Sequence, residues 1–513
     1  MGLTLRRISA IMAFFISFLG LAQSYHGFVD DNFNGVYGVV ANPANVVDSR
    51  HRLNINVASF NSLLSSDFQT PKLGNANVLN QVSGLFRNGF DSWLFRNGEN
   101  ADLAGDGVQT TLANLDFLAP VSFMAEINER HAVGLLLRAR AIYNYNNIDG
   151  RFWSGLANSF GQESNMDFLA QDLDVTTHYW SEVGVTYGTV LVDDGTHFLK
   201  AGGTLKLLLG QGVEQIYVDE QEGQLPLQSN LVVGTTPENN QVELNGGFTY
   251  VRSFSENTNA QNIGYFDRLG DAAQGIGGDV GVVYEYRTRA TSRVPIGRNG
   301  GGFNKYKFKL ALSLLDLGRI KYTDIPGVNT YRVNISQPTL FAAEELSSNF
   351  LNTINAANNG GTVNVERPGG DIEVALPTSI QLSADLLLRD GQPFYLNGSF
   401  NSTLVQSALP FNNNRLNLYA LTPRYEQKHY SVYVPISYSE LSSFQVGFGA
   451  RLGPVTLGTA SIINIVTGEE NLNTLYFGAN IPLLQDRDQS FRKRGRYHKK
   501  RRRHHRFSRR RRR

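Results

Sequence analysis

The sequence of 513 residues contains no cysteine, only three tryptophans and only four methionines. The lack of cysteine excludes a disulfide framework, thiolate catalysis and a cysteine-ligated zinc site. Long apolar runs are also scarce, because beyond the first two dozen residues no stretch approaches the roughly 20 apolar residues of a membrane-spanning helix. What the chain does contain is 51 glycines, 22 tyrosines and 31 phenylalanines, a composition that favours short strands and turns over a helical core.

Acidic residues are missing from the segment 491–513, which holds 15 of the 47 lysines and arginines. The remainder of the chain therefore carries a net negative charge, whereas the segment 491–513 carries a strongly positive one. Like charges at this density repel one another and bury no core, so residues 484–513 are predicted to be disordered. The tail residues expected to bind an anionic partner are Arg492, Lys493, Arg494, Lys499, Lys500, Arg501, Arg502, Arg503, Arg509 and Arg513.

Residues 1–24 have the organisation of a secretory signal peptide. Arg6 and Arg7 precede a short apolar stretch, and small residues follow, so cleavage is expected after Ala22 or Ser24. The alternative is an uncleaved anchor, but the apolar stretch is shorter than a spanning helix requires. The chain is therefore predicted to be exported without a helical membrane anchor.

Alternation of apolar and polar residues dominates the body of the chain. In 305–315, for example, Tyr306, Phe308 and Leu310 share one face, and lysines and small residues share the other. Such alternation is produced by a soluble sandwich, or by a transmembrane barrel whose apolar face meets lipid and whose polar face lines a wet lumen. In a barrel the lumen-facing candidates are Lys200, Lys206, Asp279, Glu285, Arg287, Lys307 and Lys309.

Segment length favours the barrel, because several segments alternate for ten or more residues, which is enough to cross a bilayer at a tilt. Fifteen segments can be marked: 51–60, 107–127, 132–147, 174–192, 196–211, 241–253, 275–290, 303–322, 377–388, 393–405, 415–426, 428–439, 443–452, 454–467 and 472–483. Bacterial barrels close with an even number of strands. Either a strand near 231–236 completes sixteen, or two of the marked segments form one strand and the total is 14.

The long connections, 61–106, 148–173 and 323–376, are expected at the outer side of the membrane, opposite the tight turns. Helical spacing occurs within them, over 78–94 and again in Ala343, Leu346, Phe350 and Ile354. These segments are expected to be loop helices that cap the barrel mouth, or alternatively to line a pocket for an apolar ligand.

The segment 35–45 (GVYGVVANPAN) follows the signal peptide and precedes the first strand, with Asn42, Pro43 and Ala44 at its centre. Proline fixes φ and asparagine caps nearby backbone, so this triplet suits a rigid turn. The segment resembles the N-terminal hatch of FadL-like and PorV-like outer-membrane barrels of Bacteroidota, and 314–322 (LLDLGRIKY) is similar to a strand-end motif in those barrels.

The resemblance implies an all-β transmembrane antiparallel barrel of about 14 strands (14–16) over 51–483, with a hatch at 25–50 and helical segments in long outer loops. It also implies a passive channel for a hydrophobic small molecule, or an accessory subunit of a type IX secretion or gliding complex. Both ends of such a barrel face the periplasm. The tail would then meet inner-leaflet lipid headgroups, a cell-wall polymer or an acidic periplasmic protein, or remain solvated without a partner. Export argues against nucleic acid as that partner.

Other chemical functions find little support in the sequence. Residues 30–35 match the first half of a calcium loop, but its twelfth position is Ala41 where the bidentate glutamate should stand, so no metal is expected. The histidines lie in no catalytic pattern and no phosphate-binding loop occurs, so neither a cofactor nor an enzyme is predicted. The remaining alternatives to an outer-membrane barrel are a soluble periplasmic or secreted all-β binding protein and an outer-membrane hydrolase.

Overall fold

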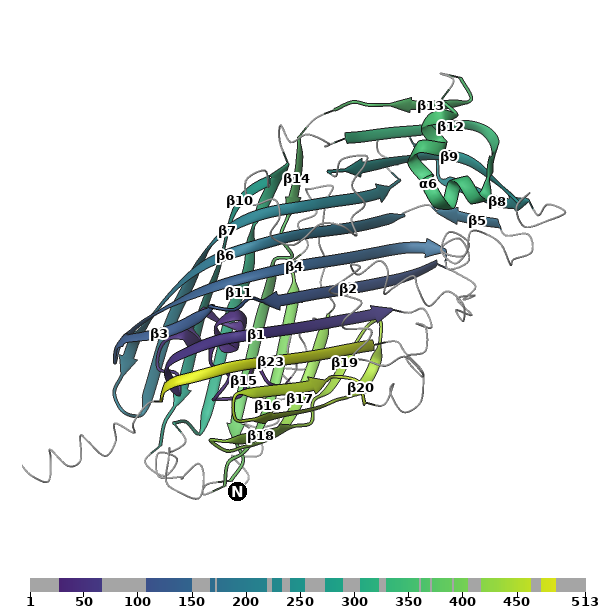
Figure 1. Ribbon diagram of the computed structural model, residues 1–513. Helices are drawn as coiled ribbons and strands as arrows, with labels where there is room; N and C mark the ends of the chain where they lie inside the picture. Colours follow the sequence, from purple (N-terminus) through teal and green to yellow (C-terminus); the bar gives the residue numbers. More distant parts are fainter. Residues whose placement is uncertain are drawn as a thin grey trace, which may run out of the picture.

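The computed structural model shows a closed antiparallel β-barrel (Figure 1). It describes residues 27–66, 108–149, 167–170, 173–218, 224–232, 240–253, 273–288, 305–322, 329–358, 361–369, 371–389, 392–404, 417–462 and 472–485. The barrel closes because β1 (His51–Ser66) pairs with β2 (Val108–Leu118) on one side and with β23 (Leu472–Gln485) on the other. No helix in these ranges is both long and apolar enough to span a membrane.

The described strands occupy 14 positions around the barrel, which confirms the smaller of the two predicted strand numbers. Several positions are occupied by two or three shorter strands, which are joined below by the word with. In order around the barrel, the positions are β1, β2 with β3 (Phe123–Asn128), β4 (His131–Asp149), β6 (Asp174–Asp193), β7 (His197–Tyr217), β9 with β10 (Gln241–Arg252, Ala273–Tyr286), β11 with β12 (Phe308–Tyr322, Asn329–Ala342), β13 with β14 and β15 (Val363–Glu366, Ile372–Ala375, Ser379–Leu387), β16 (Phe394–Thr403), β17 (Leu418–Glu426), β18 with β19 (Tyr430–Tyr433, Ile436–Ser439), β20 with β21 (Ser443–Val446, Phe448–Leu452), β22 (Val455–Thr459) and β23.

The predicted segments 241–253 and 275–290 are the two that share one position. Both pair with β7, since Arg252 lies opposite Glu214 and Ala273 lies opposite Gly210. Near 231–236 there is a short strand, β8 (Leu227–Val232), but it pairs with β9 and with β5 (Asp167–Ala170) and does not complete a sixteenth position.

The connection predicted over 323–376 is largely structured instead of being a simple loop. β12 prolongs β11 and pairs with β9, and β13 and β14 return along β12 and β11. The sequence analysis did not predict β12, β13 and β14, because the alternation of apolar and polar residues in β11 breaks off over 323–328.

The first strand begins and the last strand ends at the same end of the barrel, which we call the terminal end, because His51 pairs with Gln485. The tight turns between β3 and β4, between β6 and β7 and between β21 and β22 lie there as well. The opposite end, the loop end, carries β12, β13 and the helix α6 (Ala343–Ala356) (Figure 1).

The side of each strand that faces the lumen follows from its contacts with residues 27–50, which lie inside the barrel. A Cβ on Gly202 would lie 2.6 Å from the backbone of Pro43, and one on Gly134 would lie 3.4 Å from the Val46 side chain. Because strand side chains alternate, the even-numbered residues of β4 face the lumen and its odd-numbered residues face outward. Glycine at these positions allows residues 43–46 to lie directly against the wall.

α6 packs on the outward side of the wall, and not across the barrel mouth as expected. Its residues Leu346 and Ile354 are fully buried in an apolar cluster with Tyr143, Tyr250 and Tyr331. Tyr143 is an odd-numbered residue of β4 and therefore faces outward, and Tyr250 pairs with Tyr331 on the same face. The helical periodicity of 343–354 is thus confirmed, and the predicted helical segment 78–94 lies outside the described residues.

Candidate functional site

The segment inside the lumen contains two short helical turns, α2 (Val36–Ala41) and the 3-10 turn η1 (Pro43–Val46). Tyr37 of α2 is fully buried, packs edge-on against Phe28 and donates a 3.1 Å hydrogen bond to Asn56 Oδ1 of β1. We call residues 27–50 the hatch. Its apolar residues form a common core with lumen-facing residues of the wall, including Leu118, Leu136 and Phe198.

Asn42 joins the hatch to two strands of the wall. Its Nδ2 donates to the backbone oxygen of Leu312 at 3.0 Å and to that of Val282 at 3.3 Å, on β11 and β10. Its Oδ1 accepts a 3.0 Å hydrogen bond from the Ala44 backbone and so caps η1. Pro43 stands at the first position of that turn, where its missing N–H costs nothing. In this triplet, Asn42 both caps the turn and contacts the wall, Pro43 fixes φ at the first position of the turn, and Ala44 donates the capping hydrogen bond.

Ion pairs hold the two ends of the hatch. Asp31 lies 2.9 Å from Arg451 Nε and accepts a hydrogen bond from the Tyr433 hydroxyl. Asp48 lies 2.5 Å from Arg287 Nη2 and 2.9 Å from Lys305 Nζ. Both carboxylates therefore link the hatch to the barrel wall.

The pKa of each carboxylate reflects these contacts. Burial raises the pKa of Asp48, but the charges of Lys305 and Arg287 outweigh burial and lower it well below the ordinary value. For Asp31, burial is likewise outweighed, mainly by Arg451, so its pKa is lowered too. Both groups are consequently ionised, and the hatch stays paired, throughout the neutral and mildly acidic range.

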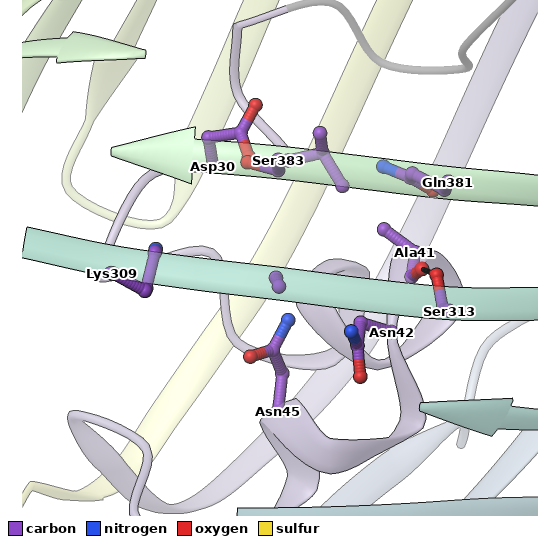
Figure 2. Close-up of a pocket in the computed structure, with 10 residues that line it drawn as sticks. Asp30, Ala41, Asn42, Asn45, Lys309, Ser313, Gln381 and Ser383 are labelled. Carbon is purple, nitrogen blue, oxygen red and sulfur yellow. Dashed lines mark hydrogen bonds between the residues drawn. The ribbon is translucent and has the colours of Figure 1, made fainter. Parts of the chain in front are cut away.

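A small cavity of about 20 Å³ separates the hatch from β11 and β15, which is room for about one water molecule. Figure 2 shows Asp30 of the hatch beside Ser383 of β15 and Asn42 of the hatch beside Ser313 of β11; Asn45, Lys309 and Gln381 also line the cavity. Ser383 donates to Asp30 Oδ1 at 2.8 Å, and Ser313 donates to the Ala41 oxygen at 2.7 Å. Hydrogen bonds from serine hydroxyls therefore hold the hatch to the wall in addition to the ion pairs.

A network of buried charges, which we call the charged network, lies on the lumen side of β2, β4, β6, β7, β10 and β11. Lys206 Nζ lies 2.6 Å from Asp316 and 2.8 Å from Asp279, and Arg140 bridges Asp316 and Glu182 at 2.8 Å each. Arg138 pairs with Asp116 at 2.5 Å and with Glu182 at 3.3 Å. Removing one member of such a network leaves an unpaired buried charge and costs roughly 3–5 kcal/mol.

The backbone at Asp316 creates the place for this network. Asp316 has a φ of 56°, and the register between β10 and β11 shifts there, as expected of a β-bulge. Its N–H donates to Asp279 Oδ1 at 2.7 Å, and Thr378 donates to its carbonyl oxygen at 2.8 Å. The segment 314–322 forms the C-terminal part of β11, which ends at Tyr322, and the bulge lies within it at residues 315–316.

An apolar cluster lies on the lumen side next to the charged network. It consists of Ile142, Trp180, Leu208, Val213, Val251, Ala273, Ile320, Tyr322, Ile372, Val374 and Leu376. The two groups meet at Trp180, which donates to Glu182 at 2.8 Å and lies 4.7 Å from the Arg140 guanidinium. The lumen wall thus changes along its length from charged to apolar.

The sequence-predicted lumen residues do not come together in a single site. Lys206 and Asp279 belong to the charged network, Glu285 and Arg287 lie with Asp48, and Lys200 donates to the Val47 oxygen at 2.8 Å. Lys309 lies 3.8 Å from Asp385, and the half-buried Lys307 precedes β11. Tyr306 departs from the predicted apolar face, because its hydroxyl donates to Asp385 inside the barrel.

Sequence reasoning missed the central members of the charged network, Arg138, Arg140, Glu182 and Asp316. For the arginines a signal was present, since Arg138 and Arg140 alternate with Leu137, Ala139 and Ala141. For Asp316 no local pattern existed, because the bulge that turns it inward depends on β10. The basic tail residues, 492–513, lie outside the described part of the chain.

Asp30 and Asp31 of the calcium-like motif bind Ser383, Tyr433 and Arg451. Among the described residues no group of three or more histidines and carboxylates could hold a metal ion.

Comparisons with known proteins give one family and several solved structures. No curated protein matches the chain. Among solved structures it is similar to a TodX monoaromatic hydrocarbon channel, deltaS2 mutant (10% identity, 87% of this chain and 93% of that chain, TM-score 0.42). It is also similar to the toluene transporter TbuX of Ralstonia pickettii (11%, 87% and 92%, 0.36) and to a FadL homologue of Pseudomonas aeruginosa (10%, 90% and 96%, 0.38). The model of DUF5723, a family of unknown function, matches residues 43–460, so the chain belongs to this family.

Proposed function

We propose that the chain is an outer-membrane β-barrel that spans the bilayer with the terminal-end part of its strands. The observation that carries this proposal is a change in exposure along the outward face of single strands. On β7, Leu205 and Leu207 are 67% and 46% exposed, whereas Leu209, two residues nearer the loop end, is only 8% exposed. On β6, Val185 is 57% exposed and Ser181 is 3% exposed.

A membrane explains this change directly. Within the bilayer, outward apolar side chains need no protein cover because lipid surrounds them. Beyond the bilayer the same face meets water, and there α6 and its neighbours cover it. The exposed apolar belt extends around most of the barrel and includes Val57, Val185, Leu205, Leu207, Ile276, Val282, Leu312, Leu386, Leu421, Ile436, Phe448, Leu457 and Phe477. A soluble protein rarely exposes so large an apolar surface.

Aromatic residues lie where the belt meets the terminal end, as expected at a membrane–water interface. Tyr187 lies on β6 and Tyr284 on β10, the two strands that flank β7. The Tyr187 hydroxyl shares a 2.7 Å hydrogen bond with His131, and the Tyr284 hydroxyl shares one of 2.7 Å with His197. A second aromatic row, Phe400, Tyr419, Tyr438 and Phe444, crosses four adjacent strands nearer the loop end. The soluble alternative offers no reason for two such rows.

Within this barrel we propose a passive channel for an apolar small molecule, closed by the hatch in the conformation described. The apolar lumen cluster around Trp180 offers a surface for such a molecule between the loop end and the charged network. The hatch, tied to the wall by Asn42, Asp31 and Asp48, then blocks the way to the terminal end. A role as a secretion or gliding scaffold stays a second hypothesis, with the basic tail as its proposed contact to an anionic periplasmic partner.

Fractionation of expressing cells tests the membrane part of the proposal. We expect the folded chain in outer membranes, with a gel mobility that changes on heating; a soluble, heat-insensitive chain contradicts it.

Uptake of the apolar dye N-phenylnaphthylamine by the same cells tests the channel. We expect faster uptake in cells producing Asp31→Asn, whose hatch has lost an ion pair, than in cells producing the wild-type chain. Equal rates in both, and in cells without the protein, contradict a channel and leave the barrel itself standing.

A further inference from the structure

The outward side of β11 carries two exposed cations, Arg319 and Lys321, whose side chains are 57% and 64% exposed. Pairing places Arg319 opposite Ile276 of β10, and Ile276 lies opposite Leu207, an outward residue of the apolar belt. Cross-strand partners share one face of a sheet, so both cations face away from the lumen. Ile320, which lies between them in the sequence, belongs to the apolar lumen cluster on the other face.

These cations lie at the edge of the belt on its loop-end side. Lys321 lies opposite Gln274, which in turn lies opposite Leu209, where the outward side of β7 is already covered. Tyr284, in the terminal-end aromatic row, is ten residues further along β10 than Gln274. Ten residues span about 34 Å of strand, or about 26 Å along the membrane normal at a tilt of about 40°. An apolar band about 25 Å tall therefore ends close to Lys321, which places its ammonium group at the level of the lipid headgroups.

A single carboxylate pairs with both cations. Glu373 of β14 lies 2.9 Å from Arg319 Nη1 and 3.4 Å from Lys321 Nζ. Two cations against one carboxylate leave this group with an excess of positive charge. Arg52, another exposed cation, differs because it pairs with Glu126 at 2.8 Å in a neutral pair near the terminal end. An excess of positive charge at headgroup level attracts anionic lipid.

Apolar side chains continue from the cations toward the middle of the belt. Ile276 and Leu317 lie on the same outward face and are 72% and 36% exposed. A soluble phosphate ion would contact the cations and leave these two side chains uncovered. A lipid with an anionic headgroup matches both parts of the surface, because its phosphate meets the cations and its acyl chain covers the apolar residues.

We propose that Arg319 and Lys321 hold the headgroup of an anionic phospholipid in the leaflet at the loop end, with an acyl chain along Ile276 and Leu317. The site lies on the outside of the barrel and is separate from the apolar lumen cluster. The inference rests on the proposed function, because these residues meet lipid headgroups only if the belt spans a bilayer.

Native mass spectrometry of the full-length chain in a non-ionic detergent tests the site with phosphatidylglycerol and the zwitterionic phosphatidylcholine. We expect the wild type to bind phosphatidylglycerol several-fold more tightly. A cation near an anionic lipid surface strengthens binding roughly fivefold, so the double variant Arg319→Gln, Lys321→Gln should bind phosphatidylglycerol roughly tenfold or more weakly. Glu373→Gln leaves the cations without their carboxylate and should bind it more tightly. Arg52→Gln, the matched control, should bind like the wild type.

The outcomes separate this proposal from the one on which it rests. Equal affinity of the wild type for the two lipids overturns the site, and an equal loss in Arg52→Gln and the double variant overturns its location. Displacement of the lipid by inorganic phosphate at the same concentration identifies a site for the free ion instead. A sample whose gel mobility does not shift on heating overturns the barrel itself. If the double variant fails to shift, Lys321→Gln alone replaces it and should weaken phosphatidylglycerol binding several-fold.

Discussion

Replacement of Leu205 by lysine distinguishes a lipid-facing belt from a merely solvent-exposed one. Leu205 is 67% exposed, and Leu225, near the loop end, is 65% exposed. In a soluble protein the two substitutions are equivalent, and each changes the free energy of unfolding by about 0.5 kcal/mol or less. In a membrane barrel they differ, because only Leu205 lies within the bilayer.

The depth of Leu205 sets the expected magnitude. Leu199 of β7 pairs with Tyr284 of the terminal-end aromatic row, and Leu205 lies six residues further along. Six residues span about 20 Å of strand, or about 15 Å along the membrane normal at a tilt of about 40°. An apolar band about 25 Å tall therefore has its middle close to Leu205, where a lysine costs roughly 2–4 kcal/mol.

Urea unfolding of the chain in phospholipid vesicles, followed by the gel mobility of the folded form, measures both variants. We expect Leu205→Lys to be destabilised by about 2–4 kcal/mol and Leu225→Lys to remain within about 0.5 kcal/mol of the wild type. If Leu205→Lys is as stable as Leu225→Lys, the belt does not face lipid and the membrane reasoning is refuted.

Three further predictions concern the hatch and the loop end. Asp31→Asn leaves Arg451 buried without its carboxylate, so we expect the free energy that holds the hatch to the wall to fall by about 3–5 kcal/mol. Residues 27–50 should then be cleaved faster by a protease. An unchanged rate of proteolysis would show that this ion pair does not anchor the hatch. Because the pKa of Asp48 is lowered in the folded chain, its contribution is complete above the unfolded value of about 3.9 and is lost as the pH falls through the folded value. Protease protection of the hatch should hold at pH 5 and weaken only below about pH 4, and loss already at pH 6 would disprove this. Leu346→Asp buries a charge under α6 and should open 343–356 to protease while the heat-dependent gel shift persists; loss of that shift would place α6 in the membrane part.

Alternation alone predicted much of the wall, and the positions where it failed have a common cause. The pattern in Lys200, Lys206 and Asp279 placed these residues on the polar face, and they do lie toward the lumen. It could not show that 241–253 and 275–290 form one strand, because that depends on their pairing with β7. The inward turn of Asp316 likewise depends on the shifted register between β10 and β11.

By itself, the sequence determined which residues share a face of each strand, where the Asn-Pro-Ala turn stands and where the basic tail begins. These are properties of neighbouring residues: a side-chain period of two, the fixed φ of proline and the sum of local charges. Only the tertiary structure decided what covers each face. Leu205 and Leu209 read alike in the sequence, but one is exposed within the apolar belt and the other is buried beyond it. The difference comes from the path of the chain at the loop end, where distant segments return to pack against the outward side of the sheet.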